Sequence, residues 1–520
     1  MANRDGYGND FDDGPQDGQG RMIQMTVANS PTVKLAIVGV SRDCFPLELT
    51  RARLGRLVKA CKVRGLKVAA CPTIIENETD ALAALEQARH AGANAAVIYL
   101  GNFGPEGPLS IFAQRFDGPV MACAAAEESG KDLINGRGDA YCGMLNASYN
   151  FNLRNVAVHI PQMPVGLPEE LAEKIAHFQT VARMAIGVRN LKIFSFGPRP
   201  QDFYACNAPI KPLHDLGVEV MENSELDMVV LYQGVSEKDP QVKAIARKMA
   251  AELGAGNTYP DLLPKLARFE AALTRFAQQN LGSRKYAIFA NKCWPAFEKA
   301  FGFVPCYVNS RFAAKGMPIA CEVDMYGALS EYLCQLASDH PATLLDINNT
   351  VPADMLKGAN LKGAAPTDLF MGFHCGNTPS CCMKTCAMKF QLIMNRLMED
   401  PAQSPDITRG TLEGQIKPGA TTFFRLQGNA ESRLVSYVAQ GEILDLDPRS
   451  FGGIGVFAIP DFARFYRHVL IGKRFPHHGA VAFSHCGQAL FDAVQLLGVT
   501  DIYAPLPKPM LYPGENPFSR

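Results

Sequence analysis

The sequence has no net charge, a single tryptophan and no long run of apolar residues. Lysine and arginine total 51, and aspartate and glutamate also total 51. No electrostatic excess is therefore available to hold nucleic acid or an anionic membrane, which disfavours both as partners. No run approaches the roughly 20 apolar residues of a membrane span, and no signal-peptide pattern opens the sequence. Because the composition is that of an ordinary globular protein, we expect a soluble, cytoplasmic protein.

Cysteine, in contrast, is plentiful, with 15 residues spread through apolar runs such as "LVKACKV" and "VMACAAA". This usage is typical of a reducing compartment, where cysteine behaves as a small hydrophobic residue. The densest cluster, "CGNTPSCCMKTC" (residues 375–386), does not form two clean CxxC pairs. The spacing therefore disfavours a structural zinc site.

A chain of 520 residues is too long for one hydrophobic core, which predicts two or three domains. Residues 1–30 are rich in glycine, aspartate and asparagine and predict a disordered tail. Strand–helix alternation over residues 31–160 predicts a parallel α/β domain, and the same pattern restarts over residues 161–338. Short β-like runs between glycine and proline turns over residues 339–520 predict a mainly antiparallel C-terminal domain.

Two acidic residues stand out in "GMPIACEVDMYGALSEYLCQLASDHPATLLDINN" (residues 316–349). Glu322 falls where a predicted strand passes into a helix, and Asp346 falls 24 residues later, at the end of the next predicted strand. The carboxyl ends of strands are where α/β proteins bind ligands, so the two carboxylates can converge. Acidic residues at such places are also common helix caps, a role that suits Asp324.

Two adjacent histidines lie in "KRFPHHGAVAFSHCGQALFDAVQLLG" (residues 473–498). Consecutive side chains of an extended segment point to opposite faces, so one of His477 and His478 is expected to face inward. Together with the two carboxylates, an inward histidine makes an oxygen- and nitrogen-donor set that suits Mn²⁺, Mg²⁺ or Fe²⁺. A lone histidine is more often structural than a ligand, so spacing alone leaves both readings open.

These segments resemble the L-fucose isomerase family, whose arabinose isomerase relatives share its fold. The family has a Glu, an Asp two residues later and a metal-binding Asp 24 residues after the Glu, matched here by Glu322, Asp324 and Asp346. Its C-terminal Asn-His-Gly corresponds to "HHG", which implies that His478 is the metal ligand and His477 replaces the substrate-facing Asn. The implied fold class is α/β, with two Rossmann-like parallel domains followed by a mainly antiparallel, β-rich C-terminal domain.

The resemblance also suggests which residues contact the substrate. The family's pocket tryptophan has no counterpart in "YLGNFGPEG" (residues 99–107), where Phe103 could stack on a sugar instead; the single tryptophan is Trp294. The candidate substrate-binding residues are Arg42, Asn102, Phe103, Asn291, Lys292, His374, Cys375, Arg409 and His477.

By this resemblance the chain is a metal-dependent aldose–ketose isomerase, an intramolecular oxidoreductase of carbohydrate metabolism. It would interconvert an open-chain aldose and its 2-ketose by an enediol proton transfer. Glu322 and Asp346 would be the catalytic pair, with their order of action left open, and Glu322, Asp346 and His478 would hold Mn²⁺, or else Co²⁺ or Mg²⁺.

The implied substrate is an L-fucose- or D-arabinose-like sugar, or a C6-anionic hexose such as sulfoquinovose. Arg42, Lys292 and Arg409 are among the donors that would suit an anionic group, but these cations could equally pair with nearby carboxylates. The alternatives from other classes are a metal-dependent sugar hydrolase or lyase that uses the same three ligands, and a sugar-binding protein.

The resemblance further implies a homo-oligomer, a homohexamer of stacked trimers. In such an assembly the first domain of a neighbouring subunit completes each pocket, and Arg42 and Phe103 are the expected contributors. The absence of net charge on so large a chain also fits an oligomer that buries much of its surface.

Overall fold

The computed structural model describes residues 29–518 in three sheets and the helices that cover them. The predicted disordered tail therefore lies outside the described residues, except for its last two positions. Asn29 is buried, and its side chain donates hydrogen bonds to the carbonyl oxygens of Ala287 and Gly316, at 2.7 and 3.1 Å. The described chain thus starts against the second domain before it enters the first.

The N-terminal sheet has five parallel strands in the order β2-β1-β3-β4-β5. Its three central strands are buried along their whole length, as expected of a parallel sheet with helices on both faces. The strands are β1 (Leu35–Val40), β2 (Val68–Ala70), β3 (Ala95–Leu100), β4 (Val120–Ala125) and β5 (Val165–Gly166). The helices are α1 (Leu47–Val63), α2 (Glu78–His90), α3 (Glu106–Arg115), α4 (Asp132–Asn135) and α5 (Ala140–Leu153).

The second sheet has four parallel strands in the order β7-β6-β8-β9. Its carboxyl edge is where the loops nearest the candidate site begin. The strands are β6 (Leu191–Phe196), β7 (Glu219–Asn223), β8 (Tyr286–Ala290) and β9 (Ile319–Ala320). The helices are α7 (Ile210–Asp215), α8 (Glu225–Gln233), α9 (Pro240–Leu253), α10 (Leu263–Asn280), α11 (Phe297–Phe301), α12 (Cys306–Ala314) and α13 (Met325–Ser338).

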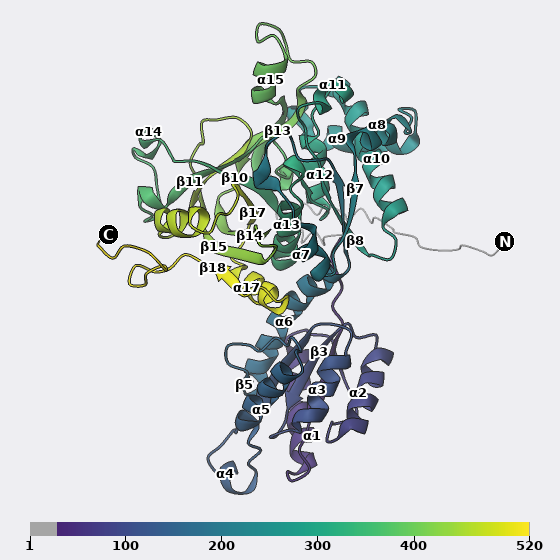
Figure 1. The fold of residues 1–520 in the computed structure, drawn as a ribbon, viewed down its shortest axis with the longest axis vertical. Helices are drawn as coiled ribbons and strands as arrows, with labels where there is room; N and C mark the ends of the chain where they lie inside the picture. The colour runs from purple at the N-terminus through teal and green to yellow at the C-terminus, as the bar shows by residue number, and fades with distance from the viewer. Residues whose placement is uncertain (1–28, 519–520) are drawn as a thin grey trace, which may run out of the picture.

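A long helix, α6 (Pro168–Arg189), joins the first α/β domain to the rest of the molecule. Proline at its first turn and Asn190 just after its last residue are typical of the two ends of a helix. It packs against α1 of the N-terminal domain and against α13 and α17 of the larger body. In Figure 1 the N-terminal domain accordingly forms a separate lower lobe, with α4 at its far end.

The C-terminal sheet has nine strands, six of which close into a ring. The order β16-β11-β10-β17-β14-β15 returns to β16 through a further pairing, and all six neighbouring pairs are antiparallel. Closure leaves these six strands without a free edge. The strands are β10 (Thr343–Asn349), β11 (Leu369–His374), β12 (Met383–Phe390), β13 (Arg409–Ile416), β14 (Gly419–Gly428), β15 (Leu434–Leu444), β16 (Gly453–Ala458), β17 (His478–Ala482) and β18 (Asp501–Tyr503).

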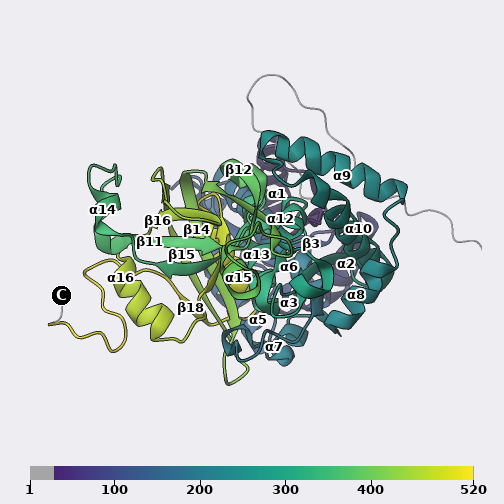
Figure 2. The same cartoon turned by 90° about the horizontal axis from the view of Figure 1, so that it is seen from above.

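Aromatic side chains fill the centre of this ring. Phe370, Phe423 and Phe457 have ring centroids 5.0 to 5.4 Å apart, and all three are buried. Viewed from above, the ring lies beside the helices of the second domain rather than over them (Figure 2). The helices of this part are α14 (Ala353–Leu356), α15 (Leu392–Met398), α16 (Phe462–Phe465) and α17 (Gly487–Leu496).

The predicted fold class, two parallel α/β units followed by a mainly antiparallel β-rich unit, is confirmed. The C-terminal sheet departs from purely antiparallel pairing at two places, because β13 runs parallel to β16 and β18 runs parallel to β15. The boundaries after residues 160 and 338 stay a prediction, since α6 and α13 pack against more than one unit. Within residues 29–518, no helix combines the length and apolar character needed to cross a membrane.

Candidate metal centre and active site

The histidine and one of the carboxylates face each other across two strands of the closed ring. Asp346 of β10 is the direct cross-strand partner of His478 of β17, and the Ile347 amide donates to the His477 carbonyl at 2.9 Å. His478 Nε2 lies 3.3 Å from Asp346 Oδ1, and the His478 side chain is fully buried. Asp346 was predicted at the end of a strand. It lies inside β10, which continues to Asn349 through an irregularity in its pairing with β11.

The second carboxylate, Glu322, reaches the same histidine from a strained turn. The short strand β9 ends at Ala320, and Glu322 and Val323 follow with φ angles of 53° and 57°. Positive φ is uncommon for residues with a Cβ and is an outlier for a β-branched one such as Val323. Backbone strain of this kind is concentrated at functional sites. The turn places Glu322 Oε2 3.2 Å from His478 Nε2.

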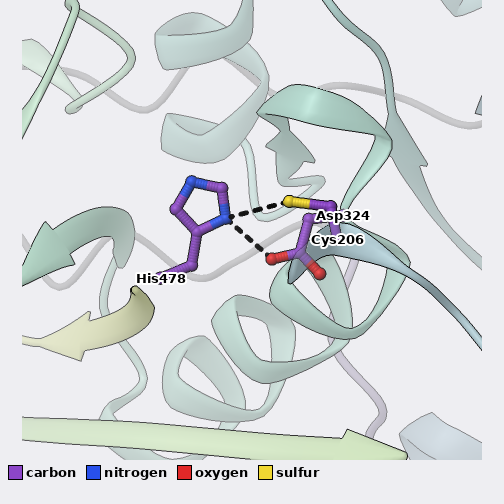
Figure 3. A group of neighbouring side chains, drawn as sticks. All are labelled: Cys206, Asp324 and His478. Carbon is purple, nitrogen blue, oxygen red and sulfur yellow. Dashed lines mark hydrogen bonds and ion pairs between the residues drawn. The ribbon is translucent and has the colours of Figure 1, made fainter. Parts of the chain in front are cut away.

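The other ring nitrogen of His478, Nδ1, is hydrogen-bonded to the buried ion pair of Asp324 and Arg425. Its Nδ1 donates to Asp324 Oδ2 at 2.8 Å, and the Cys206 thiol lies 3.9 Å from the same nitrogen (Figure 3). Arg425, also fully buried, donates to both oxygens of Asp324, at 2.6 and 2.9 Å. Because Nδ1 carries the donated hydrogen, the lone pair of neutral His478 is on Nε2, between Glu322 and Asp346.

Asp324 is also the helix cap that its position suggested. Its Oδ1 accepts a hydrogen bond from the amide of Gly327 at 2.8 Å, at the first turn of α13. A Cβ at Gly327 would lie 2.5 Å from Asp324 Oδ2, too close to be tolerated without movement. The glycine therefore makes room for the carboxylate that orients His478.

The electrostatics of the site are those of carboxylates gathered around one imidazole. Burial alone would raise the pKa of Asp324, but the charge of Arg425 and the bond from His478 hold the pKa of this carboxyl well below its usual range. Burial likewise opposes the ionised forms of Glu322 and Asp346, yet the neighbouring histidines keep the pKa of each carboxyl below its usual value. Three carboxylates thus stay ionised in a buried site that holds one arginine.

The side chains fit a divalent cation. Glu322 Oε2 and His478 Nε2 are both buried, and neither atom has a hydrogen-bond partner among the described residues. Asp346, His477 and His478 also offer ligand atoms that lie within 4.8 Å of one another. The surrounding carboxylates raise the pKa of His478 well above its ordinary value, against the effect of burial. The negative charge that favours a proton on Nε2 would equally favour a metal ion there. The imidazole must lose that proton to bind the metal.

Comparisons with known proteins place two parts of the chain in one family. Residues 36–189 match the model of the fucose/sulfoquinovose isomerase N-terminal domain, and residues 372–504 match that of the L-fucose isomerase C-terminal domain. The chain belongs to the fucose isomerase family.

The curated relatives described here are all named sulfoquinovose isomerases. The sulfoquinovose isomerase of Alkalicoccus urumqiensis is 27% identical over 304 residues, 56% of this chain and 60% of that protein. That of Clostridium sp. (strain MSTE9) is 30% identical over 200 residues, 36% of this chain and 42% of that protein. That of Priestia aryabhattai is 26% identical over 188 residues, 35% of this chain and 40% of that protein. The chain thus spans 60% or less of the length of these relatives.

Three predicted substrate residues of this fucose isomerase family member lie beside the predicted metal ligands. His374, at the end of β11, places Nε2 3.8 Å from Glu322 Oε2, while its Nδ1 accepts the Cys375 amide hydrogen at 2.9 Å. Burial raises the pKa of Cys375 to about 12, so the thiol is neutral at neutral pH. Burial and the charge of His478 lower the pKa of His477 to about 4. His477, with its Nε2 3.7 Å from Asp346 Oδ1, can therefore contact a sugar as a neutral donor.

Three others cluster at the carboxyl edge of the N-terminal sheet instead. Arg42 lies over the ring of Phe103, 4.6 Å from its centroid, and its amide donates to the side chain of Asn102 at 2.9 Å. A Cβ at Gly143 of α5 would meet the Phe103 carbonyl, so this cluster lies against α5 in the lower lobe. Among the described residues, the contacts of these three side chains are all within the N-terminal domain.

The remaining three take part in structural contacts. Asn291 exchanges amide hydrogen bonds with Asn309, while its carbonyl accepts the amide of Val323 at 2.9 Å and so supports the Glu322 turn. Lys292 is paired with Glu225 at 3.0 Å. Arg409 is paired with Asp261 at 3.0 Å and with Asp406 at 3.3 Å. Arg42 is likewise paired with Glu106, at 3.5 Å, so all three cations that were expected to meet an anionic substrate are compensated by carboxylates.

Few of the residues that surround the site could be identified from sequence patterns. Arg425 is a charged residue in the apolar run "TTFFRLQG". A charge buried in such a strand is costly unless it is paired, so a buried acidic partner could be expected. Phe203 carried no such signal, yet its ring meets His477 edge-on at 5.3 Å. Trp294, which had no expected place in the pocket, meets Phe203 edge-on at 6.0 Å. Two aromatic residues of the second domain thus stand beside the site.

Proposed function

We propose that the chain is a metal-dependent aldose–ketose isomerase. The observation that carries this proposal is the convergence of Glu322 and Asp346 on the buried Nε2 of His478, in a chain of the fucose isomerase family. The curated relatives are named sulfoquinovose isomerases, which supports the same class of reaction. Two carboxylates at one site are what a proton transfer between adjacent carbons requires.

The metal would be held by Glu322, Asp346 and His478. When bound, it would supply Lewis-acid polarisation of the sugar's carbonyl and hydroxyl oxygens. We propose Mn²⁺, with Co²⁺ or Mg²⁺ less effective, because two carboxylate ligands and one imidazole form a donor set harder than a thiolate site. Asp324 and Arg425 orient the imidazole, so that its Nε2 and not its Nδ1 faces the two carboxylates.

The chain's own carboxylates would move the proton. One of Glu322 and Asp346 takes the proton from C2 of the open-chain aldose, and the other takes the proton of the C2 hydroxyl. The two protons return to C1 and to its oxygen, which gives the 2-ketose. The neighbouring histidines lower the pKa of both carboxyls, so each starts in the ionised form that a base needs. Such general acid–base assistance typically contributes about 10²–10⁴-fold to the rate. Neutral His477, near Asp346, and His374, near Glu322, are placed to hold hydroxyl groups of the sugar.

The expected result of an aldose panel tests this function. Purified protein supplied with Mn²⁺ is expected to convert at least one aldose into its ketose, with sulfoquinovose as the favoured substrate and L-fucose and D-arabinose as the neutral comparisons. Ketose formation is measured by chromatography or NMR. A chelator such as EDTA is expected to stop the reaction, and Mn²⁺ is expected to restore it.

The same assay separates the alternative functions. An isomerase conserves the mass of the sugar and incorporates no oxygen from water, whereas a hydrolase or lyase that uses the same ligands changes the mass of its product. Sugar binding without turnover would indicate a binding protein. Any of these outcomes in place of ketose formation would contradict the proposal.

We further propose a homo-oligomer, a hexamer of stacked trimers. The support is a stripe of exposed apolar side chains along α5, in the lobe that also carries Arg42 and Phe103. Its members lie four residues apart on one helical face, with between 63% and 67% of each exposed: Tyr141, Leu145, Tyr149 and Leu153. A contiguous exposed apolar surface of this kind marks an interaction site.

Charge on the α5 stripe is expected to break the oligomer. Replacing both Leu145 and Tyr149 with glutamate should reduce a particle of six chains to smaller species. The new carboxylates would have to lose their water at the interface, and like charges placed together there repel one another. Light scattering coupled to size-exclusion chromatography measures the mass against the 56.5 kDa of one chain. Leu397→Glu, at a 71% exposed leucine of α15, is the matched control. An active wild-type monomer would refute the oligomer.

We also propose that the protein works in the cytoplasm. The support is its cysteine usage, because all fifteen cysteines are free thiols and ten of them are buried. Such free, buried thiols are typical of reducing compartments.

A further inference from the structure

A pocket of about 340 Å³ opens at the carboxyl edge of the second sheet. Its walls come from the loop after β6, the loop after β8 and the first residue of α8. The carboxyl edge of a parallel sheet is the usual place for a ligand. The pocket is lined by Pro198, Arg199, Gln201, Glu225, Lys292, Pro295 and Ala296.

The pocket shares its supporting segments with the candidate metal centre. Lys292 follows Asn291, whose carbonyl accepts the amide of Val323 beside Glu322. Gly197, two residues before Arg199, lies so close to the same turn that an added Cβ would be 3.0 Å from Val323. Pocket and metal centre are therefore neighbours on the same two loops.

An aromatic wall connects the two on the other side. Phe203, which follows the pocket residue Gln201 in the same loop, meets His477 and Trp294 with its ring. Trp294 directly precedes the pocket residue Pro295. A ligand with one end at Glu322 and Asp346 could therefore extend along this wall to the pocket.

Arg199 differs from the other cations near the site because its charge is not compensated. Lys292, the other cation of the pocket, is bound to Glu225 at 3.0 Å. Within residues 29–518 no carboxylate is paired with Arg199. Its guanidinium lies 4.8 Å from the Tyr204 ring centroid, its Nη1 is at the limit of hydrogen bonding to Asn207, 3.5 Å away, and its Nε is buried without a partner.

We propose that Arg199 binds the anionic group at the far end of an open-chain sugar whose C1 and C2 lie at Glu322 and Asp346. The ligand class is a tetrahedral oxyanion, a sulfonate or a phosphate ester, carried on C6 of a hexose. A guanidinium presents its donors in a planar fork that matches two oxygens of such a group. The inference rests on the proposed function and names the residue that selects its substrate.

Removal of the charge at Arg199 is the test. Arg199→Gln is expected to raise the KM for sulfoquinovose about 10- to 100-fold, the range for one hydrogen bond to a charged group, and to leave kcat/KM for L-fucose within about twofold. Arg199→Lys should recover part of the loss, because it keeps the charge and loses the fork. Glucose 6-phosphate is tested beside sulfoquinovose to decide between sulfonate and phosphate. Arg433→Gln, at an exposed arginine of the turn before β15, is the control for general charge loss.

Binding measured by calorimetry separates this proposal from the proposed function. Weaker binding of sulfoquinovose or glucose 6-phosphate to Arg199→Gln than to wild type supports the pocket even where no aldose is turned over. Equal binding of both sugars to the two proteins overturns it, whatever their activity. An equal loss for L-fucose and sulfoquinovose also overturns it, because Arg199 would then support the site in general. A wild-type protein that converts only neutral aldoses leaves the isomerase standing and refutes the anion pocket.

Discussion

Replacement of His478 with alanine is expected to remove both the bound metal and the activity. The imidazole lies between the other two ligands, with its Nε2 3.2 Å from Glu322 Oε2 and 3.3 Å from Asp346 Oδ1. Lewis-acid stabilisation is worth several kcal/mol, and each 1.4 kcal/mol is a factor of ten, so kcat/KM should fall by about a thousandfold or more. Elemental analysis of the purified variant measures the metal, and the ketose assay measures the activity.

Variants of the other two proposed ligands, and of a nearby histidine that is not a ligand, complete this experiment. Glu322→Gln and Asp346→Asn are expected to weaken the metal and to remove one proton-transfer group each, so their activity should stay low even at saturating Mn²⁺. His485→Ala is the matched control, because His485 lies in the same segment but is half exposed and bonds to the Gly441 carbonyl. Unchanged metal content in all three ligand variants would refute the site.

Asp324→Asn is expected to damage both the stability and the metal affinity. An amide cannot neutralise Arg425, and loss of one partner of a buried ion pair typically costs about 3–5 kcal/mol. The same change weakens the acceptor that holds His478 Nδ1, and loss of such a partner usually lowers metal affinity about 10- to 100-fold. Chemical denaturation measures the first effect, and Mn²⁺ titration measures the second.

A double variant separates these two effects. Asp324→Leu with Arg425→Leu removes both charges, and apolar replacement of a whole buried pair is often neutral for stability. We expect it to recover most of the stability lost by Asp324→Asn, apart from about 1 kcal/mol for the lost helix cap, and to recover none of the metal affinity. Glu128→Gln breaks an exposed pair with Arg56 and should cost less than about 1 kcal/mol. Wild-type affinity in the double variant would show that Asp324 does not orient His478.

The order of the elements could be predicted because apolar periodicity and turn residues are local properties. The alternation over residues 31–160 predicted the first sheet, and the extended backbone assumed for His477 and His478 agrees with the strand that begins at His478. The closure of six strands into a ring could not be predicted in this way. It depends on which strands pair, and the pairing of β15 with β16 has no signature in either segment.

The candidate site was predicted in part. The spacing of Glu322 and Asp346 left a metal site open, and the resemblance to the fucose isomerase family, through the "HHG" turn, led to three side chains that meet in the structure. Asp324 was predicted only as a cap, because a local pattern shows a free helix amide but not a histidine 154 residues away. Arg199 and Phe203 were missed because neither belongs to a motif, and their importance comes only from the loops that the second sheet places beside His477.

The closed ring has a consequence for how sugar specificity can evolve. Asp346 and His478 belong to strands with a neighbour on each side, so a slip of register would have to disrupt several ladders at once. Arg199, Phe203 and Trp294 belong to loops, which tolerate substitution and insertion. Descendants of one ancestor could therefore exchange these loops and acquire new sugars while inheriting the reaction unchanged. Libraries for a new substrate belong in residues 197–206, and the ring should be left alone.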